Sequence, residues 1–347
     1  MEPRDKAPMS ARPVIPLVDV GDTGPLGLVK AEPERMAALL DVAQAHYSGP
    51  VLSIADRLSE YWMARNDNPY LEEILNVADY LGDPGIFMLN MSYEWSCTSA
   101  IGPDLERTGN RLLRTLDWPL DGLGRNVIVA RMRGEAGSYD AVTWPGFSGV
   151  LTAMAPGRFS AAINQPPLRK RSRIFPIDWG LERVRMWRED ALPPVHLLRQ
   201  VFDQCESFDE AFDVLTTEPI AMPAFFTLSG IGTRENALIE RTPDEVSFQI
   251  GPNAIANHWR NLKIPSYGRG IGSQARLKKM DEFRYDTANN FTWVVPPILN
   301  PTTRLSVIAN AAEGSLQVLG WEREFGAGKN ELPVPATQVY DSDAIDL

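Results

Sequence analysis

The apolar residues of this chain change their spacing close to residue 97, and this change limits the folds that the chain can adopt. Before that point they recur at helical spacing, with breaks at Gly and Pro. After it, most segments alternate between apolar and polar residues, as strands do, and are separated by Gly, Pro and Asp. We therefore expect a mostly helical first part followed by a body built of β-sheets.

The predicted elements follow this division. In the first part, a short strand at 16–20 precedes helices at 34–46, 51–64, 70–81 and from 83 to about 93. Strands are expected later at 111–116, 126–132, 139–144, 149–154, 158–163, 225–228, 237–241, 246–250, 254–256, 304–310 and 315–321. Helices at 194–204, 208–216 and 273–283 interrupt these strands, and the tail after Gly326 is expected to be loosely held. This order predicts an α+β protein with sheets layered between helices.

Charge and hydropathy exclude several classes of partner. A net charge of −11 argues against nucleic acid, because binding to a phosphate backbone requires a broad basic face. The basic run at 169–173 is short, and we interpret it as a solvated loop. No apolar run approaches the length of a membrane span, and no apolar stretch follows the first residues as in a signal peptide. We expect a cytoplasmic protein without a membrane span.

Histidines and cysteines are few. His46, His196 and His258 lie far apart without the spacing of metal ligands, so neither a metal site nor a cofactor is predicted. The two cysteines are Cys97 and Cys205, and Cys205 has the pattern of a buried position on an amphipathic helix. A disulfide framework is therefore not expected.

Cys97 stands in the stretch Tyr93-Glu94-Trp95-Ser96-Cys97-Thr98-Ser99, directly before small and hydroxylated residues. A thiol is the most nucleophilic side chain near neutral pH, and a nearby cation raises its thiolate fraction. A lone cysteine is more often a small buried apolar residue than a nucleophile. The cysteine alone therefore leaves both interpretations open.

Further segments occur in the order and spacing of a known family. They are Cys97-Thr98-Ser99, Arg114-Thr115-Leu116-Asp117-Trp118, Gly146 to Thr152, Pro156 to Ser160, Asn164, Glu240 to Pro243, Ala256-Asn257 and Pro297 to Asn300. From about Val14 to Glu322 the chain resembles acid ceramidase and N-acylethanolamine acid amidase, which are lipid amidases of the N-terminal nucleophile hydrolase group. It is more distantly similar to bile-salt hydrolase and penicillin V acylase.

This resemblance implies a four-layer αββα sandwich that is made as an inactive precursor. Cys97 would attack the carbonyl of the Ser96–Cys97 bond, and hydrolysis would leave it as a new N-terminus. Residues 1–96 would remain as a helical small subunit on a catalytic domain of residues 97–347. The freed α-amine has a reference pKa of about 8 and can take the thiol proton, which accounts for the lack of a Cys–His pair.

The resemblance also implies roles for further site residues. Arg114 would lie near the sulfur and favour the thiolate, and Asp117 would hold the α-amine, although surface Arg–Asp pairs are common. Asn257 would donate a side-chain N–H to the oxyanion. Arg276 would be the late arginine of the family, with Arg269 as the poorer match.

Aromatic residues provide candidates for an apolar substrate pocket, although aromatic residues near a β-core more often pack against each other. The candidates are Trp95, Trp118, Trp144, Phe147 and Trp179. Asn164 is assigned to substrate binding by its match to the family. Relatives that work in acidic compartments carry an acidic residue after this asparagine, whereas this chain has Gln165, which cannot titrate. Activation by acid is therefore not expected.

These features predict a cysteine amidase that cleaves the amide between an apolar acyl group and an amine, by way of an acyl-thioester on Cys97. The same chemistry would serve an acyltransferase in which an amine takes the acyl group. An alternative of another class is a non-catalytic binding protein that keeps the fold but never matures. The expected partners are a small-molecule N-acyl amide and the protein's own cleaved N-terminal segment.

Overall fold

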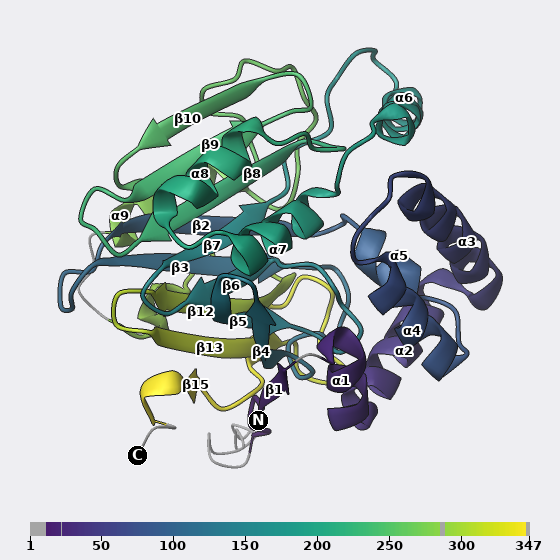
Figure 1. Ribbon diagram of the computed structural model, residues 1–347, viewed down its shortest axis with the longest axis horizontal. Helices are drawn as coiled ribbons and strands as arrows, with labels where there is room; N and C mark the ends of the chain where they lie inside the picture. The colour runs from purple at the N-terminus through teal and green to yellow at the C-terminus, as the bar shows by residue number, and fades with distance from the viewer. Residues whose placement is uncertain (1–11, 22, 285–288, 345–347) are drawn as a thin grey trace.

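Two β-sheets lie face to face at the centre of the protein (Figure 1). The structure is a computed structural model and describes residues 12–21, 23–284 and 289–344. The larger sheet has the strand order β1-β4-β5-β6-β7-β8-β9-β10. Its strands are β1 (Leu17–Gly21), β4 (Ile128–Gly134), β5 (Gly137–Thr143), β6 (Thr152–Ala155), β7 (Phe159–Asn164), β8 (Ala224–Gly230), β9 (Asn236–Arg241) and β10 (Val246–Ile250). Neighbouring strands are antiparallel except β1 and β4, which are parallel.

The second sheet carries the cysteine. Its strands, in spatial order, are β11 (Asn253–Ile255), β2 (Ser96–Pro103), β3 (Asn110–Asp117), β12 (Thr303–Asn310), β13 (Ser315–Glu322) and β14 (Val334–Pro335), with β15 (Tyr340–Asp341) also pairing with β13. In the antiparallel pair of β2 and β3, Cys97 faces Leu116 and Ser99 faces Arg114. Nearly every residue of these two strands is buried, so the polar side chains on them must find partners inside the protein.

Helices cover the outer faces of both sheets. α7 (Pro194–Gln204) and α8 (Phe208–Thr217) pack on the larger sheet, and α9 (Ser273–Phe283) packs on β2 and β11 of the other. The Ser207 side chain caps α8 by accepting from the backbone N–H of Glu210. The four-layer αββα arrangement predicted for the chain is confirmed.

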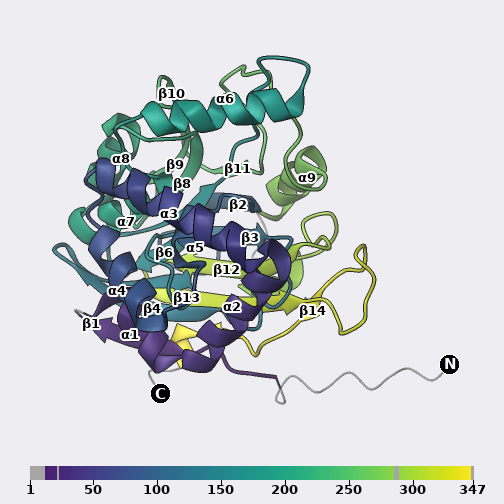
Figure 2. The same ribbon diagram turned by 90° about the vertical axis from the view of Figure 1, so that its right-hand side faces the viewer.

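The first part of the chain is helical and lies beside the sandwich (Figures 1 and 2). It contains α1 (Gly24–Ala31), α2 (Pro33–Tyr47), α3 (Gly49–Arg65), α4 (Leu71–Leu81) and α5 (Ile86–Met91). Proline at the first or second position starts α1, α2 and α3, where a missing N–H costs no hydrogen bond. Buried residues such as Trp62 and Ile74 belong to the main hydrophobic core, and β1 extends the larger sheet. The segment is therefore an integral part of the fold.

Helix α6 (Phe175–Arg188) was not predicted, and it stands away from both sheets at the top of Figure 2. Only Asp178 and Met186 are buried on it, whereas Ile177, Trp179 and Val184 are each about half exposed. Because its apolar residues do not form one buried stripe, the sequence lacks the periodic pattern that marks a packed helix.

The prediction of a loosely held tail after Gly326 is wrong for its described part. Thr337 and Tyr340 are buried, and the Thr337 hydroxyl accepts a hydrogen bond from the Gly320 N–H at 3.0 Å. The two tail strands each span only two residues, so they are too short to show an alternating pattern. Within the described residues, no helix is both long and apolar enough to cross a bilayer.

Candidate active site

Cys97 is the second residue of β2 and is completely buried between the two sheets. Its Sγ accepts a hydrogen bond from Nη2 of Arg114 at 3.1 Å. The S–H group lies 3.8 Å from the backbone carbonyl of Ile163, on strand β7 of the opposite sheet. The thiol therefore has one cationic neighbour and one acceptor for its proton.

Arg114 reaches the sulfur from β3. The same Nη2 donates to the Ile163 carbonyl at 3.0 Å, and Nη1 donates to the Thr152 hydroxyl. Within the part of the chain that the structure describes, no carboxylate forms an ion pair with Arg114. Since its charge is not neutralised by a carboxylate, it is available to a thiolate on Cys97.

Arg276 of α9 lies on the other side of the Cys97 backbone. It is completely buried, and its Nη1 donates at 2.6 Å both to the Cys97 carbonyl and to the Thr98 hydroxyl. The same atom lies 3.4 Å from Oδ2 of Asp117, which is also fully buried. These contacts bring Arg276 into the cluster with Cys97 and Asp117.

Asp117 ends β3 directly opposite Ser96, the residue before the cysteine. Its Oδ1 accepts from the Thr303 hydroxyl at 2.8 Å, and the Ser96 hydroxyl lies 3.5 Å from its Oδ2. The carboxylate is thereby held beside the Ser96–Cys97 peptide bond.

Asn257 follows β11 and meets the backbone of Cys97. The Cys97 N–H donates to its Oδ1 at 3.0 Å, and Arg276 Nη2 donates to the same oxygen at 2.8 Å. Its Nδ2 donates one hydrogen to the Gln165 carbonyl at 2.8 Å, which leaves a second hydrogen on that nitrogen. Cys97, Arg114, Asp117, Asn257 and Arg276 are thus brought together from four separate segments of the chain.

Burial dominates the ionisation of this cluster. It raises the pKa of the Cys97 thiol, and the charge of Arg114 opposes this effect only in part. Burial also raises the pKa of Asp117, against the opposing charge of Arg276. In the uncleaved chain burial therefore favours the neutral thiol over the thiolate.

The residues predicted to bind substrate lie elsewhere. Trp118 and Trp144 pack edge to face in the main core, with ring centroids 6.0 Å apart, and Phe147 belongs to the same core. Asn164 joins strands, because its Oδ1 accepts from Ser99 at 3.0 Å and its Nδ2 donates to the Ala256 carbonyl at 3.2 Å. None of the four lines the cavity described next.

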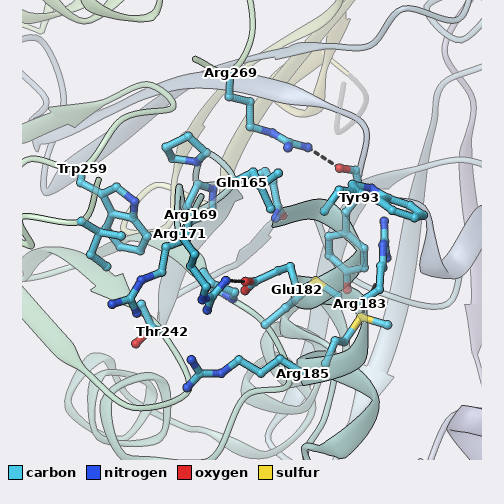
Figure 3. Close-up of a pocket in the computed structure, with 18 of the residues that line it drawn as sticks. Tyr93, Gln165, Arg169, Arg171, Glu182, Arg183, Arg185, Thr242, Trp259 and Arg269 are labelled. Atoms are coloured by element: carbon cyan, nitrogen blue, oxygen red, sulfur yellow. Dashed lines mark hydrogen bonds and ion pairs between the residues drawn. The ribbon is translucent and has the colours of Figure 1, made fainter. Parts of the chain in front are cut away.

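A cavity of about 380 Å³ opens next to the residues that precede Cys97 (Figure 3). Tyr93 and Glu94 form part of its wall, as do Gln165 and Gly270. Gly270 has a φ of +65° and approaches Ser96 so closely that a Cβ atom would lie 2.6 Å from the Ser96 hydroxyl. Cys97 itself does not line the cavity, because the segment ending at Ser96 lies between them.

Several residues of this wall were not anticipated from the sequence. Arg269 donates to the carbonyl of Trp95 at 3.2 Å and to the carbonyl of Tyr93, so it holds the segment before the cysteine. Arg183 comes from the unpredicted α6, and Arg169 and Arg171 come from the run that we interpreted as a solvated loop. Trp179, also on α6, was among the aromatic residues predicted to line a pocket, and it does line this cavity. The glycines flanking Arg269 were the one available signal, since they permit a close backbone approach.

No arrangement of three or more His, Cys, Asp or Glu side chains suited to a metal ion occurs in the ranges 12–21, 23–284 and 289–344. The chemistry available to the site is that of the thiol, the two arginines, the carboxylate and the amide.

No family model matches the chain. Acid ceramidase of Bos taurus is 29% identical over 304 residues, which cover 78% of this chain and 74% of that protein. A probable acid ceramidase of Caenorhabditis elegans is 26% identical over 282 residues, covering 71% and 68%.

Two solved structures are also similar. An N-acylethanolamine-hydrolyzing acid amidase ortholog of Caenorhabditis elegans has a TM-score of 0.47 and 19% identity, covering 61% of this chain and 92% of its own. A conjugated bile acid hydrolase of Clostridium perfringens has a TM-score of 0.39 and 8% identity, covering 71% and 96%. The αββα sandwich and the match to acid ceramidases over most of both sequences together support the similarity of this chain to acid ceramidase-like amide hydrolases of the N-terminal nucleophile group.

Proposed function

We propose that this protein is an autoprocessed cysteine amidase that hydrolyses N-acyl amines through an acyl-thioester on Cys97. The observation that carries the proposal is the environment of Cys97, where Arg114 lies 3.1 Å from the sulfur and Asn257 lies 3.0 Å from the backbone nitrogen. Polar side chains therefore hold both the sulfur and the backbone nitrogen that would become the α-amine after cleavage, as an N-terminal nucleophile requires.

Maturation would begin with attack of the Cys97 sulfur on the Ser96 carbonyl carbon. The C–N bond breaks, a thioester forms between Ser96 and the sulfur, and the Cys97 nitrogen becomes a free amine. Water then cleaves the thioester, which releases a Ser96 carboxylate and restores the thiol. The hydrogen bonds of Arg276 to the Cys97 carbonyl and of Arg269 to the Trp95 carbonyl support this step, because they fix the chain on both sides of the bond.

Turnover would follow the same route with an external amide. The freed α-amine takes the thiol proton, and the thiolate beside Arg114 attacks the substrate carbonyl. The second hydrogen on Asn257 Nδ2 is free to stabilise the oxyanion. The protonated amine then gives its proton to the leaving amine, and water hydrolyses the acyl-thioester.

Asp117 would position the amine. It is buried opposite Ser96 and is 3.4 Å from Arg276, so its carboxylate lies close to the new N-terminus. A charged hydrogen bond from the α-amine to this carboxylate would orient the lone pair towards the sulfur.

The substrate would be a lipid-type amide, as the names of the ceramidase relatives indicate. Trp179, Met186 and Trp259 offer apolar surface in the cavity beside the cleavage site. Departure of the segment that ends at Ser96 would open a path from this cavity to the sulfur, so cleavage would create both the base and the entrance.

Incubation of the purified protein with a chromogenic N-acyl amide, with and without an added amine, tests the proposal. Release of the free fatty acid at the same rate in both reactions supports a hydrolase. Transfer of the acyl group to the added amine would identify an acyltransferase. Absence of turnover, together with an intact chain and no acyl adduct on Cys97, would identify a binding protein and overturn the proposal.

A further inference from the structure

The cavity beside the cleavage site is cationic, although the protein as a whole has a net charge of −11. Five arginines and three carboxylates are among the residues that line it. The arginines are Arg169, Arg171, Arg183, Arg185 and Arg269. A local excess of positive charge in an acidic protein points to a ligand of negative charge.

The three carboxylates are already engaged. Glu182 forms an ion pair with Arg171, and Asp244 forms one with Arg185. Glu94 accepts a hydrogen bond from the Tyr47 hydroxyl, and its negative charge also acts on Arg183 and Arg269 without forming an ion pair with either. These ion pairs account for two of the five arginine charges, and among the described residues no carboxylate forms an ion pair with the other three.

Arg183 and Arg269 are the important pair, because both are half-buried and neither forms an ion pair with a carboxylate in the described part of the chain. Arg183 contacts the Trp179 ring, 5.2 Å from its centroid, and Arg269 donates to backbone carbonyls. Burial lowers the pKa of Arg269 to about 10, and the positive charge of Arg183 contributes to this shift. The two guanidinium groups therefore repel each other across a partly buried wall. Glu94 offsets this repulsion in part, and an anion bound between the two groups would offset it further.

The two ends of the cavity differ in chemical character. Figure 3 shows Arg183 and Arg269 beside Tyr93, at the end next to the cleavage site, whereas Trp259 lies at the opposite end. Trp259 packs edge to face against Phe225, with ring centroids 4.8 Å apart, so that end has an aromatic surface, beside which Figure 3 shows an arginine of the 169–171 segment. A ligand with a charged end close to the reacting bond and an apolar end remote from it fits this arrangement.

We propose that the cavity selects N-acyl amides that carry an anionic group a few bonds from the amide, as in an N-acyl amino acid, with Arg183 and Arg269 as the residues that bind the anion. This inference rests on the proposed amidase function and names its substrate class. Guanidinium groups suit carboxylates and sulfonates, because they donate two parallel hydrogen bonds to a pair of oxygens.

Arg269 would act twice. Before cleavage its Nε and Nη2 donate to the carbonyls of Trp95 and Tyr93, which belong to the segment that ends at the cleavage site. When that segment leaves, the same donors lose their acceptors and become available to the substrate. The precursor would therefore protect the anion site with its own backbone.

Paired substrates on the cleaved protein test the inference. N-dodecanoylglycine and N-dodecanoylethanolamine differ only in the group on the methylene next to the amide nitrogen, which is a carboxylate in the first and a hydroxymethyl group in the second. Both are used below their critical micelle concentrations. We expect kcat/KM for the glycine conjugate to be at least about tenfold higher, since a charge-assisted bidentate pair is lost in the other. The methyl ester of the glycine conjugate, which is neutral, should behave like the ethanolamide.

Two variants separate the anion site from the general charge of the protein. Arg183→Gln should reduce the preference to less than about threefold, by lowering kcat/KM for the anionic substrate alone. Arg133→Gln, which removes an equal charge from an exposed position on β4, should leave the preference unchanged. Arg269→Gln should also reduce the preference and should in addition slow self-cleavage.

The outcomes distinguish the two proposals. Equal turnover of the charged and neutral amides, or an unchanged preference in Arg183→Gln, would overturn the inference while leaving the amidase intact. A third substrate is an N-acylethanolamine whose acyl chain ends in a carboxylate. If the protein preferred it to N-dodecanoylglycine, the inference would also be overturned, because that carboxylate would reach the Trp259 end of the cavity. No turnover of any amide and no acyl adduct on Cys97 would overturn the amidase itself.

Discussion

Nη2 of Arg114 lies 3.1 Å from Sγ of Cys97 although the two residues are not opposite each other in the sheet. Arg114 is paired with Ser99, two residues further along β2, and its side chain extends back along the strands to the sulfur. The Thr152 hydroxyl and the Ile163 carbonyl, both from the opposite sheet, accept its remaining hydrogen bonds and hold it there. The approach of the two sheets therefore places the cation beside the thiol.

The first prediction concerns Arg114. Arg114→Met, in a Cys205→Ala background and incubated until cleavage is complete, should raise the apparent pKa of the Cys97 thiol by about one unit or more. Loss of the neighbouring cation removes the effect that opposes burial. The pH dependence of iodoacetamide labelling measures this shift, with Arg133→Met as the control. Identical labelling profiles in both variants would show that Arg114 does not stabilise the thiolate.

The second prediction concerns cleavage. Purified protein should consist of two fragments, the larger beginning at Cys97, instead of one chain of 38.6 kDa. Cys97→Ala should remain whole and inactive because it lacks the nucleophile, whereas Cys205→Ala, buried at the end of α7, should cleave normally. Mass spectrometry across a wide pH range checks both variants. Full turnover by an uncleaved chain would contradict the proposed mechanism.

The third prediction concerns Asn257. Asn257→Ala should lower kcat by about two to three orders of magnitude, as loss of one oxyanion donor does in other hydrolases. It should also slow self-cleavage, because its Oδ1 accepts the hydrogen bond of the Cys97 nitrogen. Turnover is measured on the cleaved fraction, with thermal unfolding as a control for folding. Unchanged kcat in that fraction would remove Asn257 from the site.

The fourth prediction concerns stability in acid. His196 is fully buried on α7, where Asn68 Nδ2 lies 2.8 Å from its Nδ1, and burial lowers its pKa from 6.5 to about 3. The histidine is neutral in the folded protein but becomes charged in the unfolded chain below pH 6.5. Its contribution to stability is therefore present above that pH and is lost as the pH falls, by about 1.4 kcal/mol per pH unit down to about pH 3.

Urea unfolding of uncleaved Cys97→Ala protein between pH 7.5 and 4.5 measures this loss. Adding His196→Gln should reduce the slope of the unfolding free energy against pH by about 1.4 kcal/mol per pH unit, the amount that corresponds to one proton. Glutamine can accept the Asn68 hydrogen bond without titrating. Parallel declines in the two proteins would show that His196 does not resist protonation in the fold.

Much of this fold could be predicted because long segments bury one face. Helix α9 occupies Ser273–Phe283 as predicted, and α2, α3 and α4 lie within a few residues of their predicted bounds. The missed elements have other patterns. Strand β2 is buried on both sides and therefore does not alternate, and α6 buries almost nothing.

The site divides in a similar way. The resemblance indicated Arg114, Asp117, Asn257 and Arg276, which the structure gathers around Cys97. Apart from Arg269, the poorer match to the late arginine, it did not indicate the wall of the cavity, because those residues depend on how α6 and the segment around Arg269 approach Tyr93. Trp118 and Trp144 appeared suited to a pocket from their type alone, but their rings pack against each other. Residue type does not determine which side of a sheet faces a cavity.

The last prediction concerns the pH dependence of activity. Gln165 lines the cavity, and its backbone carbonyl accepts a hydrogen bond from the Asn257 side chain. A carboxylic acid at this position would therefore titrate next to the oxyanion site. The amide cannot titrate, which leaves the thiol and α-amine of Cys97 and the Asp117 carboxylate as the groups that set the profile. Acid restores the thiol and neutralises Asp117, whose pKa is raised by burial, so both changes reduce activity in the same direction.

We therefore expect kcat/KM of the cleaved protein to be greatest at neutral or mildly alkaline pH and to follow a broad bell with coupled apparent pKa values. Gln165→Glu should move the acid limb, because it places a titrating carboxyl beside Asn257, whereas Gln165→Met should leave the position of the limb unchanged. The profile is measured only on protein that has already cleaved, so that maturation does not contribute to the pH dependence. An optimum at about pH 4 to 5, the range of an ordinary carboxyl group, would mean that another acid controls the reaction and that the neutral side chain of Gln165 does not set the profile.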